Sequence, residues 1–216
     1  MIREKLILSF SGVGNGEILT TNSLLSASLR NLFFSQAGLV IIAASFFGQE
    51  FSNAYLRTTL LTIPSRMKLV ISKILVLSII VLGIGIISNL ICLGIIIGQY
   101  QRILTFPLVN NFLTQVMIAM LSWLFITWLT ASLTLVTKSQ TIPIAIMFSL
   151  ILGLSQMFAA LTKFAKYLPD LATMNLFFSN HAPNLLNGYQ GLLVQFFWTL
   201  NCFIIGLLLI HYQDVR

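Results

Sequence analysis

The residues best suited to nucleophilic, redox or metal chemistry in this chain are few and far apart. Cys92 and Cys202 both fall inside apolar runs, where a free buried thiol is the usual role of cysteine. His181 and His211 have no cysteine or carboxylate at the spacing of metal ligands. Paired carboxylates and a Ser/His/Asp arrangement are also missing from the sequence. We therefore expect no catalytic centre and no metal site.

Phosphate chemistry is equally unsupported. Gly12, Gly14 and Gly16 form a small glycine cluster, but no Lys-Ser/Thr follows it and no strand–turn–helix unit surrounds it. The cluster is interpreted as a loop. Because no GxxxxGK[S/T] motif is present, this chain cannot itself hydrolyse ATP, and we expect it to bind no cofactor.

The overall composition predicts an all-α, polytopic membrane protein. Of the 216 residues, 57% are hydrophobic and only 8% are charged, against about a quarter charged in a soluble domain. The formal net charge of +7 is therefore interpreted as lipid-headgroup contact at helix ends, and no nucleic-acid partner is expected.

Five apolar runs are long enough to span a bilayer. The expected spans are approximately 32–49, 69–99, 112–136, 141–161 and 191–212. Residues 1–31 are predicted to be a non-membrane segment on the external side, and 50–68 a cytoplasmic loop. The mid-span polar residues, expected mainly to form hydrogen bonds between helices, are Gln36, Asn89, Gln115, Gln156, Gln195 and Asn201.

The basic residues suggest an orientation. One side of the membrane receives Arg57, Arg66, Lys68, Lys73, Lys138 and Arg216, and the other receives Arg102, Lys163 and Lys166. The side with more Lys and Arg is expected to be cytoplasmic. Arg3, Lys5 and Arg30 then lie outside, which makes the number of basic residues equal on the two sides. The cytoplasmic assignment therefore depends on the dense group of basic residues in the 50–68 loop.

That loop also has an apolar stripe. Read as a helix, it places Leu56, Leu60, Ile63 and Met67 on one face. From periodicity alone, an interfacial helix lying in the headgroups and a docking helix that fits a cytoplasmic partner are equally acceptable.

The segment between Glu50 and Lys73 resembles a pattern in permeases of the second type of ABC exporter, which includes bacterial exporters of drugs, antibiotics, bacteriocins and polysaccharides. In that family an acidic residue closes the second membrane helix, a leucine-rich amphipathic segment follows, and Pro-Ser-Arg leads to a lysine in the next helix. Here these residues are Glu50, Leu56-Arg57, Leu60-Leu61, Pro64-Ser65-Arg66 and Lys73. Tyr167-Leu168-Pro169 is similar to the family's last external connection.

The resemblance implies a permease subunit in the cytoplasmic membrane of a bacterium. A separate ABC ATPase, which would bind ATP and Mg, and a second permease subunit, identical or homologous, are the implied partners. The implied contact with the ATPase comprises Leu56, Arg57, Leu60, Leu61 and Ile63. The implied cytoplasmic gate and interface comprise Glu50, Pro64, Arg66, Lys68 and Lys73.

Two departures from the family pattern shape the alternatives. Ser52-Asn53-Ala54 stands where the family usually has a glycine, and residues 1–31 resemble the family's first external connection instead of its first helix. The chain is therefore expected to be a shortened form or to lack its start. A non-transporting membrane protein, such as an immunity or assembly factor, remains one alternative. An intramembrane hydrolase or lipid-modifying enzyme is another, although its catalytic residues are missing.

Overall fold

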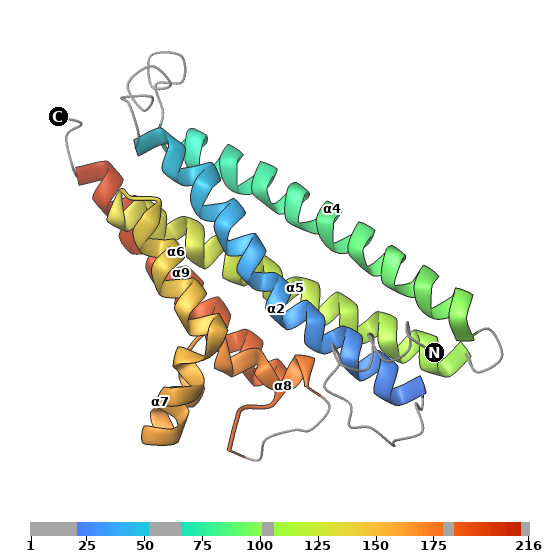
Figure 1. Cartoon of the computed structure of the whole chain (residues 1–216). Helices are drawn as coiled ribbons and strands as arrows, with labels where there is room; N and C mark the ends of the chain where they lie inside the picture. Colours follow the sequence, from blue (N-terminus) through green and yellow to red (C-terminus); the bar gives the residue numbers. More distant parts are fainter. Residues whose placement is uncertain (1–20, 52–65, 101–105, 179–183, 213–216) are drawn as a thin grey trace.

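The computed structural model describes residues 21–51, 66–100, 106–178 and 184–212. Every regular element in these ranges is helical. The long helices are α2 (Thr21–Gly48), α4 (Arg66–Tyr100), α5 (Phe106–Thr137) and α9 (Gly188–Tyr212). Figure 1 shows them as an elongated bundle. Shorter elements are η1 (Gln49–Phe51), α6 (Thr141–Ser149), η2 (Leu150–Leu154), α7 (Ser155–Leu161), η3 (Lys163–Tyr167), η4 (Leu171–Thr173) and α8 (Met174–Phe177).

Within these ranges five helical segments are long and apolar enough to cross a membrane, which confirms the predicted fold class. They are Leu29–Phe51, Met67–Ile91, Leu113–Thr137, Thr141–Leu161 and Gly188–Leu209. The first helix begins at Thr21 and so runs through the last part of the segment expected to lie outside the membrane. The connection after Tyr100 is shorter than expected, because α5 begins at Phe106 with Pro107 in its first turn, where a missing N–H costs nothing.

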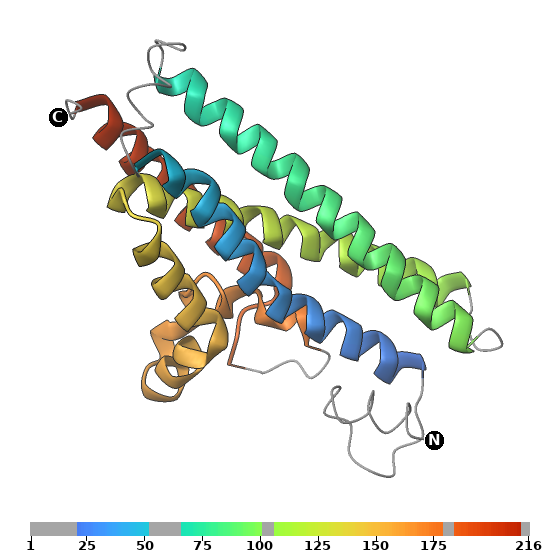
Figure 2. The ribbon, with the colours of Figure 1, turned by 45° about the horizontal axis from the view of Figure 1, so that its top comes forward.

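Helix α5 is the centre of the bundle. In the apolar window of α5, 61% of residues are buried, against 22% in α4 and 17% in α9. Its neighbours are α2, α4 and α9, and Figures 1 and 2 show α2 and α4 running along it. Hydroxyl residues can occupy this buried helix because Thr127, Thr130 and Thr134 donate to backbone carbonyls one turn back.

Among the described residues, three side-chain hydrogen bonds connect α5 to α2, α4 and α9. The Trp123 Nε1–H donates to Leu32 O of α2 at 3.2 Å. The Trp128 Nε1–H donates to Ser78 Oγ of α4 at 2.9 Å, and the Thr199 hydroxyl of α9 donates to Phe125 O at 3.2 Å. Each bond is estimated to contribute about 1 kcal/mol or less to the stability of a membrane protein. Their main effect is therefore to fix how α5 is positioned along α2, α4 and α9.

The fourth apolar segment is broken. The chain leaves the α-helix at η2, a π-helical turn, and Gly153 within it has φ 137° and ψ −6°. L-residues rarely adopt that conformation, so the kink depends on glycine. After the kink, α7 runs to Leu161 and lies at the edge of the bundle (Figure 1).

Candidate functional site

The end of α2 carries the acidic residue that the sequence predicts to close this helix. After Phe47 and Gly48 the helix tightens into η1, whose second residue is Glu50. The Glu50 side chain retains only 8% of its exposed surface. A carboxylate this buried requires a partner.

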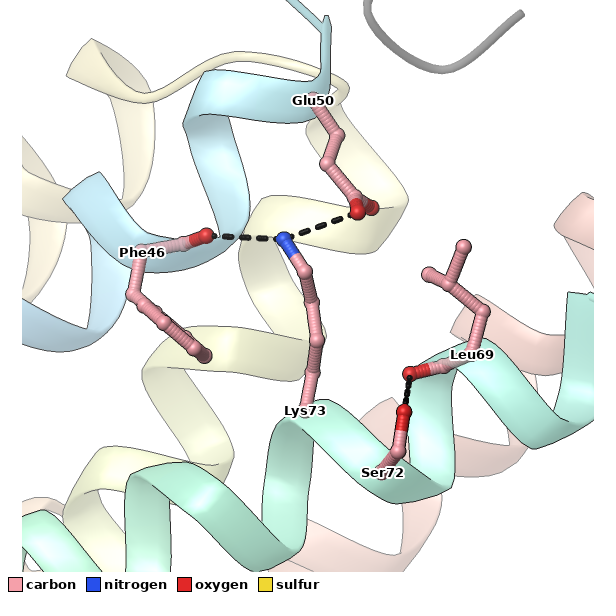
Figure 3. A network of polar contacts seen from close by, with 5 residues as sticks. All are labelled: Phe46, Glu50, Leu69, Ser72 and Lys73. Atoms are coloured by element: carbon pink, nitrogen blue, oxygen red, sulfur yellow. Dashed lines mark hydrogen bonds and ion pairs between the residues drawn. The ribbon is translucent and has the colours of Figure 1, made fainter. Parts of the chain in front are cut away.

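Lys73, in the second turn of α4, provides that partner. Its Nζ lies 2.8 Å from Glu50 Oε1 and also donates to Phe46 O at 3.1 Å (Figure 3). The ammonium lies 5.0 Å from the centre of the Phe46 ring and 5.7 Å from that of Phe47, within cation–π range. Lys73 thus joins the end of α2 to the start of α4. We call Phe46, Glu50 and Lys73 the helix clamp.

The turn between α5 and α6 meets the same end of α2. Gln140 Nε2–H donates to Ser45 Oγ at 2.8 Å. A Cβ added at Gly48 would lie 2.6 Å from Gln140 Cβ and 3.0 Å from its Cα, so only glycine allows this approach. The end of α2 therefore contacts α4 through the clamp and the α5–α6 turn through Gln140.

The structure locates some of the predicted site residues. Glu50 and Lys73 are brought together, Lys68 is exposed in the first turn of α4, and Arg66 is the first residue of α4. The remaining predicted site residues, Leu56, Arg57, Leu60, Leu61, Ile63 and Pro64, lie outside the described residues. The amphipathic helix predicted for the loop therefore stays a prediction.

A second polar group lies away from the clamp, where α5, α7, η4 and α9 meet. We call Ser122, Ser155, Asp170, Thr173 and Gln195 the Asp170 cluster; all five are buried. Gln195 Nε2–H donates to Pro169 O at 2.7 Å and to Thr173 Oγ1 at 3.0 Å. Ser122 Oγ lies 3.4 Å from Thr173 Oγ1. These contacts connect the segment preceding α8 to α9 and α5.

Asp170 contacts Ser155 within this cluster, and its other carboxylate oxygen, Oδ1, has no hydrogen-bond partner. Burial raises the pKa of the Asp170 carboxyl, and the opposing influence of Ser155 and of the nearby Asp170 and Leu171 backbone N–H groups is weaker. Sequence reasoning missed this group, since Asp170 belongs to the 163–190 connection, which has several other polar residues. Nothing in the spacing indicates that it folds inward.

Four of the mid-span polar residues make contacts that can be compared with the expected role. Asn89 and Asn201 donate to carbonyls of their own helices, four residues back. Gln195 reaches the connection before α8, and both amide atoms of Gln36 are buried without a partner. The expectation of hydrogen bonds between spanning helices is wrong for Asn89 and Asn201, because a carbonyl of the same helix is the nearer acceptor.

Metal chemistry finds no support in the described part of the chain, where no three His, Cys, Asp or Glu residues come together. In a comparison with protein families, the family described as ABC-2 family transporter protein matches residues 5–156. Comparisons with curated proteins and with solved structures returned no match.

Proposed function

Because the chain belongs to the ABC-2 family of transporter proteins, and is thus a membrane permease of an ABC transporter, we propose that it couples ATP hydrolysis by a separate ATPase to export of a hydrophobic or amphiphilic substrate. Drugs and antimicrobial peptides are the proposed substrate classes. The ATPase binds ATP and Mg, and this chain binds neither. A second permease subunit, identical or homologous, completes the pathway in the cytoplasmic membrane of a bacterium.

The helix clamp is the observation that supports the coupling proposal. Residues 52–65 join η1 to α4, and Lys73 holds the two ends of this loop together through Glu50 and Phe46. A displacement of the loop is therefore transmitted to α2 and α4 together instead of being absorbed by one helix. Glu50 and Lys73 act as positioning residues in this proposal, with Pro64, Arg66 and Lys68 completing the cytoplasmic interface.

The contact with the ATPase is assigned to the apolar stripe of the loop. Leu56, Leu60 and Ile63 form the buried face of the contact, with Arg57 and Leu61 beside it. An apolar helix face that enters a groove is a common mode of protein recognition. The loop lies on the cytoplasmic side because it has the densest group of basic residues in the chain.

The test is to reconstitute the chain with an ABC ATPase encoded beside it and to measure ATP hydrolysis and subunit association. Leu60→Asp should weaken association at least about tenfold, because an unpaired carboxylate would have to be desolvated in the contact. Thr58→Asp adds the same charge on the opposite face of the predicted helix and should leave association unchanged.

Equal loss in both variants would contradict the stripe as the contact. If the wild-type chain neither binds nor stimulates such an ATPase, the transport proposal itself fails and a non-transporting role is favoured.

A further inference from the structure

The Asp170 cluster contains a hydroxyl with more acceptors than hydrogens. Ser155 Oγ lies 2.9 Å from Leu150 O and is also within hydrogen-bonding distance of Asp170 Oδ2. A serine hydroxyl has one hydrogen to donate. If Asp170 is ionised, Ser155 can donate to the carbonyl or to the carboxylate, but not to both. If Oδ2 carries a proton, Asp170 donates to Ser155, Ser155 donates to Leu150 O, and both contacts are hydrogen bonds.

The surroundings of Asp170 favour the neutral carboxyl. The residue is 1% exposed, its Oδ1 has no partner, and no described basic residue forms an ion pair with it. A buried carboxylate without a cation is costly, and such groups usually take up a proton instead.

Titratable groups on the neighbouring elements do not supply a counter-charge. The titratable side chains that the structure describes on these elements are Arg30 on α2, Lys163, Lys166 and Tyr167 on η3, and Tyr189 and Cys202 on α9. None of them forms a hydrogen bond or ion pair with the Asp170 carboxyl. Lys163 is exposed, and Lys166 Nζ lies over the Tyr167 ring at 5.1 Å. Helices α5, α6, α7 and α8 contain no charged residue.

The contact between Ser155 and Asp170 is important for α7 because it is made by the buried residue of that helix. Ser155 is the one buried residue of α7, while Met157, Phe158 and Leu161 are exposed. By contrast, Gln195 holds η4 and the preceding Pro169 to α9 through bonds that do not involve the Asp170 carboxyl. A change at Asp170 can therefore release α7 and leave the η4–α9 contact intact.

We propose that Asp170 is a proton-binding site: its protonated carboxyl donates to Ser155 and holds α7 against η4, and loss of this proton to water releases α7. The ligand is the proton alone, bound at Oδ2. Deprotonation moves the charged carboxylate outward to solvent, which breaks its contact with Ser155. This inference does not depend on the partner ATPase or on the transported substrate.

Infrared spectroscopy of the full chain in lipid, titrated with pH in choline chloride buffer, tests the proton directly. The wild-type protein should show the carbonyl stretch of a protonated carboxyl at a pH above 3.8, the ordinary pKa of aspartic acid. Asp170→Asn should lack this band. If the spectra of the two proteins match in this region, Asp170 is ionised and the proposal is overturned.

Hydrogen exchange across the same pH range, corrected for intrinsic exchange rates, tests the release of α7. In the wild-type protein, amides of α7 should exchange faster as the infrared band disappears, while those of η4 and α9 should not. Asp170→Asn keeps a neutral donor and should show slow, pH-independent exchange in α7. Ser155→Ala should exchange fast in α7 at every pH.

Ser149→Ala is the matched control, since the exposed Ser149 hydroxyl donates only within its own helix, to Ala145 O. It should behave like the wild-type protein. A pH response in Asp170→Asn equal to that of the wild type would overturn the proposal. Failure of Asp170→Asn to fold would overturn it as well, because a site that works in the neutral state should accept a neutral isostere.

Discussion

Lys73 Nζ in α4 lies 2.8 Å from Glu50 Oε1 in η1, and the two side chains retain 21% and 8% of their exposed surface. The pair thus connects two spanning helices at a point that is mostly shielded from water. Shielding makes the loss of one partner more costly than at the surface, because the remaining charge is left poorly solvated. Lys73 retains its bond to Phe46 O and some contact with solvent, which limits that cost.

Breaking the clamp should lower both stability and coupling. Glu50→Gln is expected to reduce the free energy of unfolding by roughly 1–3 kcal/mol, and Lys73→Met by a similar amount. The double variant should be less destabilised than the sum, because each single variant already removes the shared contact. Thermal or denaturant unfolding in detergent measures this cycle, and ATPase stimulation measures coupling.

Lys68→Met is the control for the stability measurement alone, since Lys68 is an exposed lysine on the same helix, α4. A change within about 0.5 kcal/mol is expected for such a surface position. Strict additivity of the Glu50 and Lys73 variants would show that the contact has no energetic role.

The contact between Gly48 and Gln140 should be sensitive to a single methyl group. Gly48→Ala would place a Cβ 2.6 Å from Gln140 Cβ, so α2 and the α5–α6 turn must separate, at an expected cost of about 1–3 kcal/mol. Gly38→Ala on the same helix meets nothing within 4 Å and should be neutral or stabilising by up to about 1 kcal/mol. Unfolding of the two variants side by side measures the difference, and equal stabilities would show that α2 does not approach Gln140 so closely.

The kink in the fourth apolar segment should require Gly153. A Cβ there meets nothing within 4 Å, so any cost of Gly153→Ala comes from its φ of 137° and is expected to be about 1–3 kcal/mol. Gly94→Ala, also in open space, has ordinary helical geometry and should not be destabilising. Unfolding temperature reports the difference. A destabilised Gly94→Ala together with an unaffected Gly153→Ala would contradict the backbone assignment.

The raised pKa of the Asp170 carboxyl should make the unfolding free energy depend on pH. Its folded-state pKa is raised above 3.8, so the folded protein binds more protons than the unfolded chain between those two values. The unfolding free energy of the wild type, relative to Asp170→Asn, should be highest below pH 3.8. It should fall as pH rises through the folded pKa and then level off. A difference that rises with pH would indicate that the carboxylate is stabilised in the fold.

The membrane character and the all-α, polytopic fold class could be predicted from the sequence, because bilayer thickness and the cost of burying charge constrain composition directly. Lys73 and Glu50 were also identifiable, through the resemblance of the segment between them to the family pattern. Their 2.8 Å approach was not, since it depends on how α2 and α4 pack. Residues 52–65 lie outside the described residues, so their predicted contact with the ATPase stays a hypothesis.

Tertiary structure decided the rest, because it depends on which residues the bundle brings together across long stretches of chain. The sequence alone determined that α5 is apolar and rich in hydroxyls, but its central position follows from packing against α2, α4 and α9. The same is true of Asp170, which looks like a solvated loop residue in the sequence. Gln195 of α9 binds Pro169 O and so holds the connection before α8 against α9, which buries Asp170 beside Ser155. Because it is buried there, the Asp170 carboxyl becomes the proposed proton-binding site. Local pattern determines which residues can be buried, and only the fold determines which of them meet.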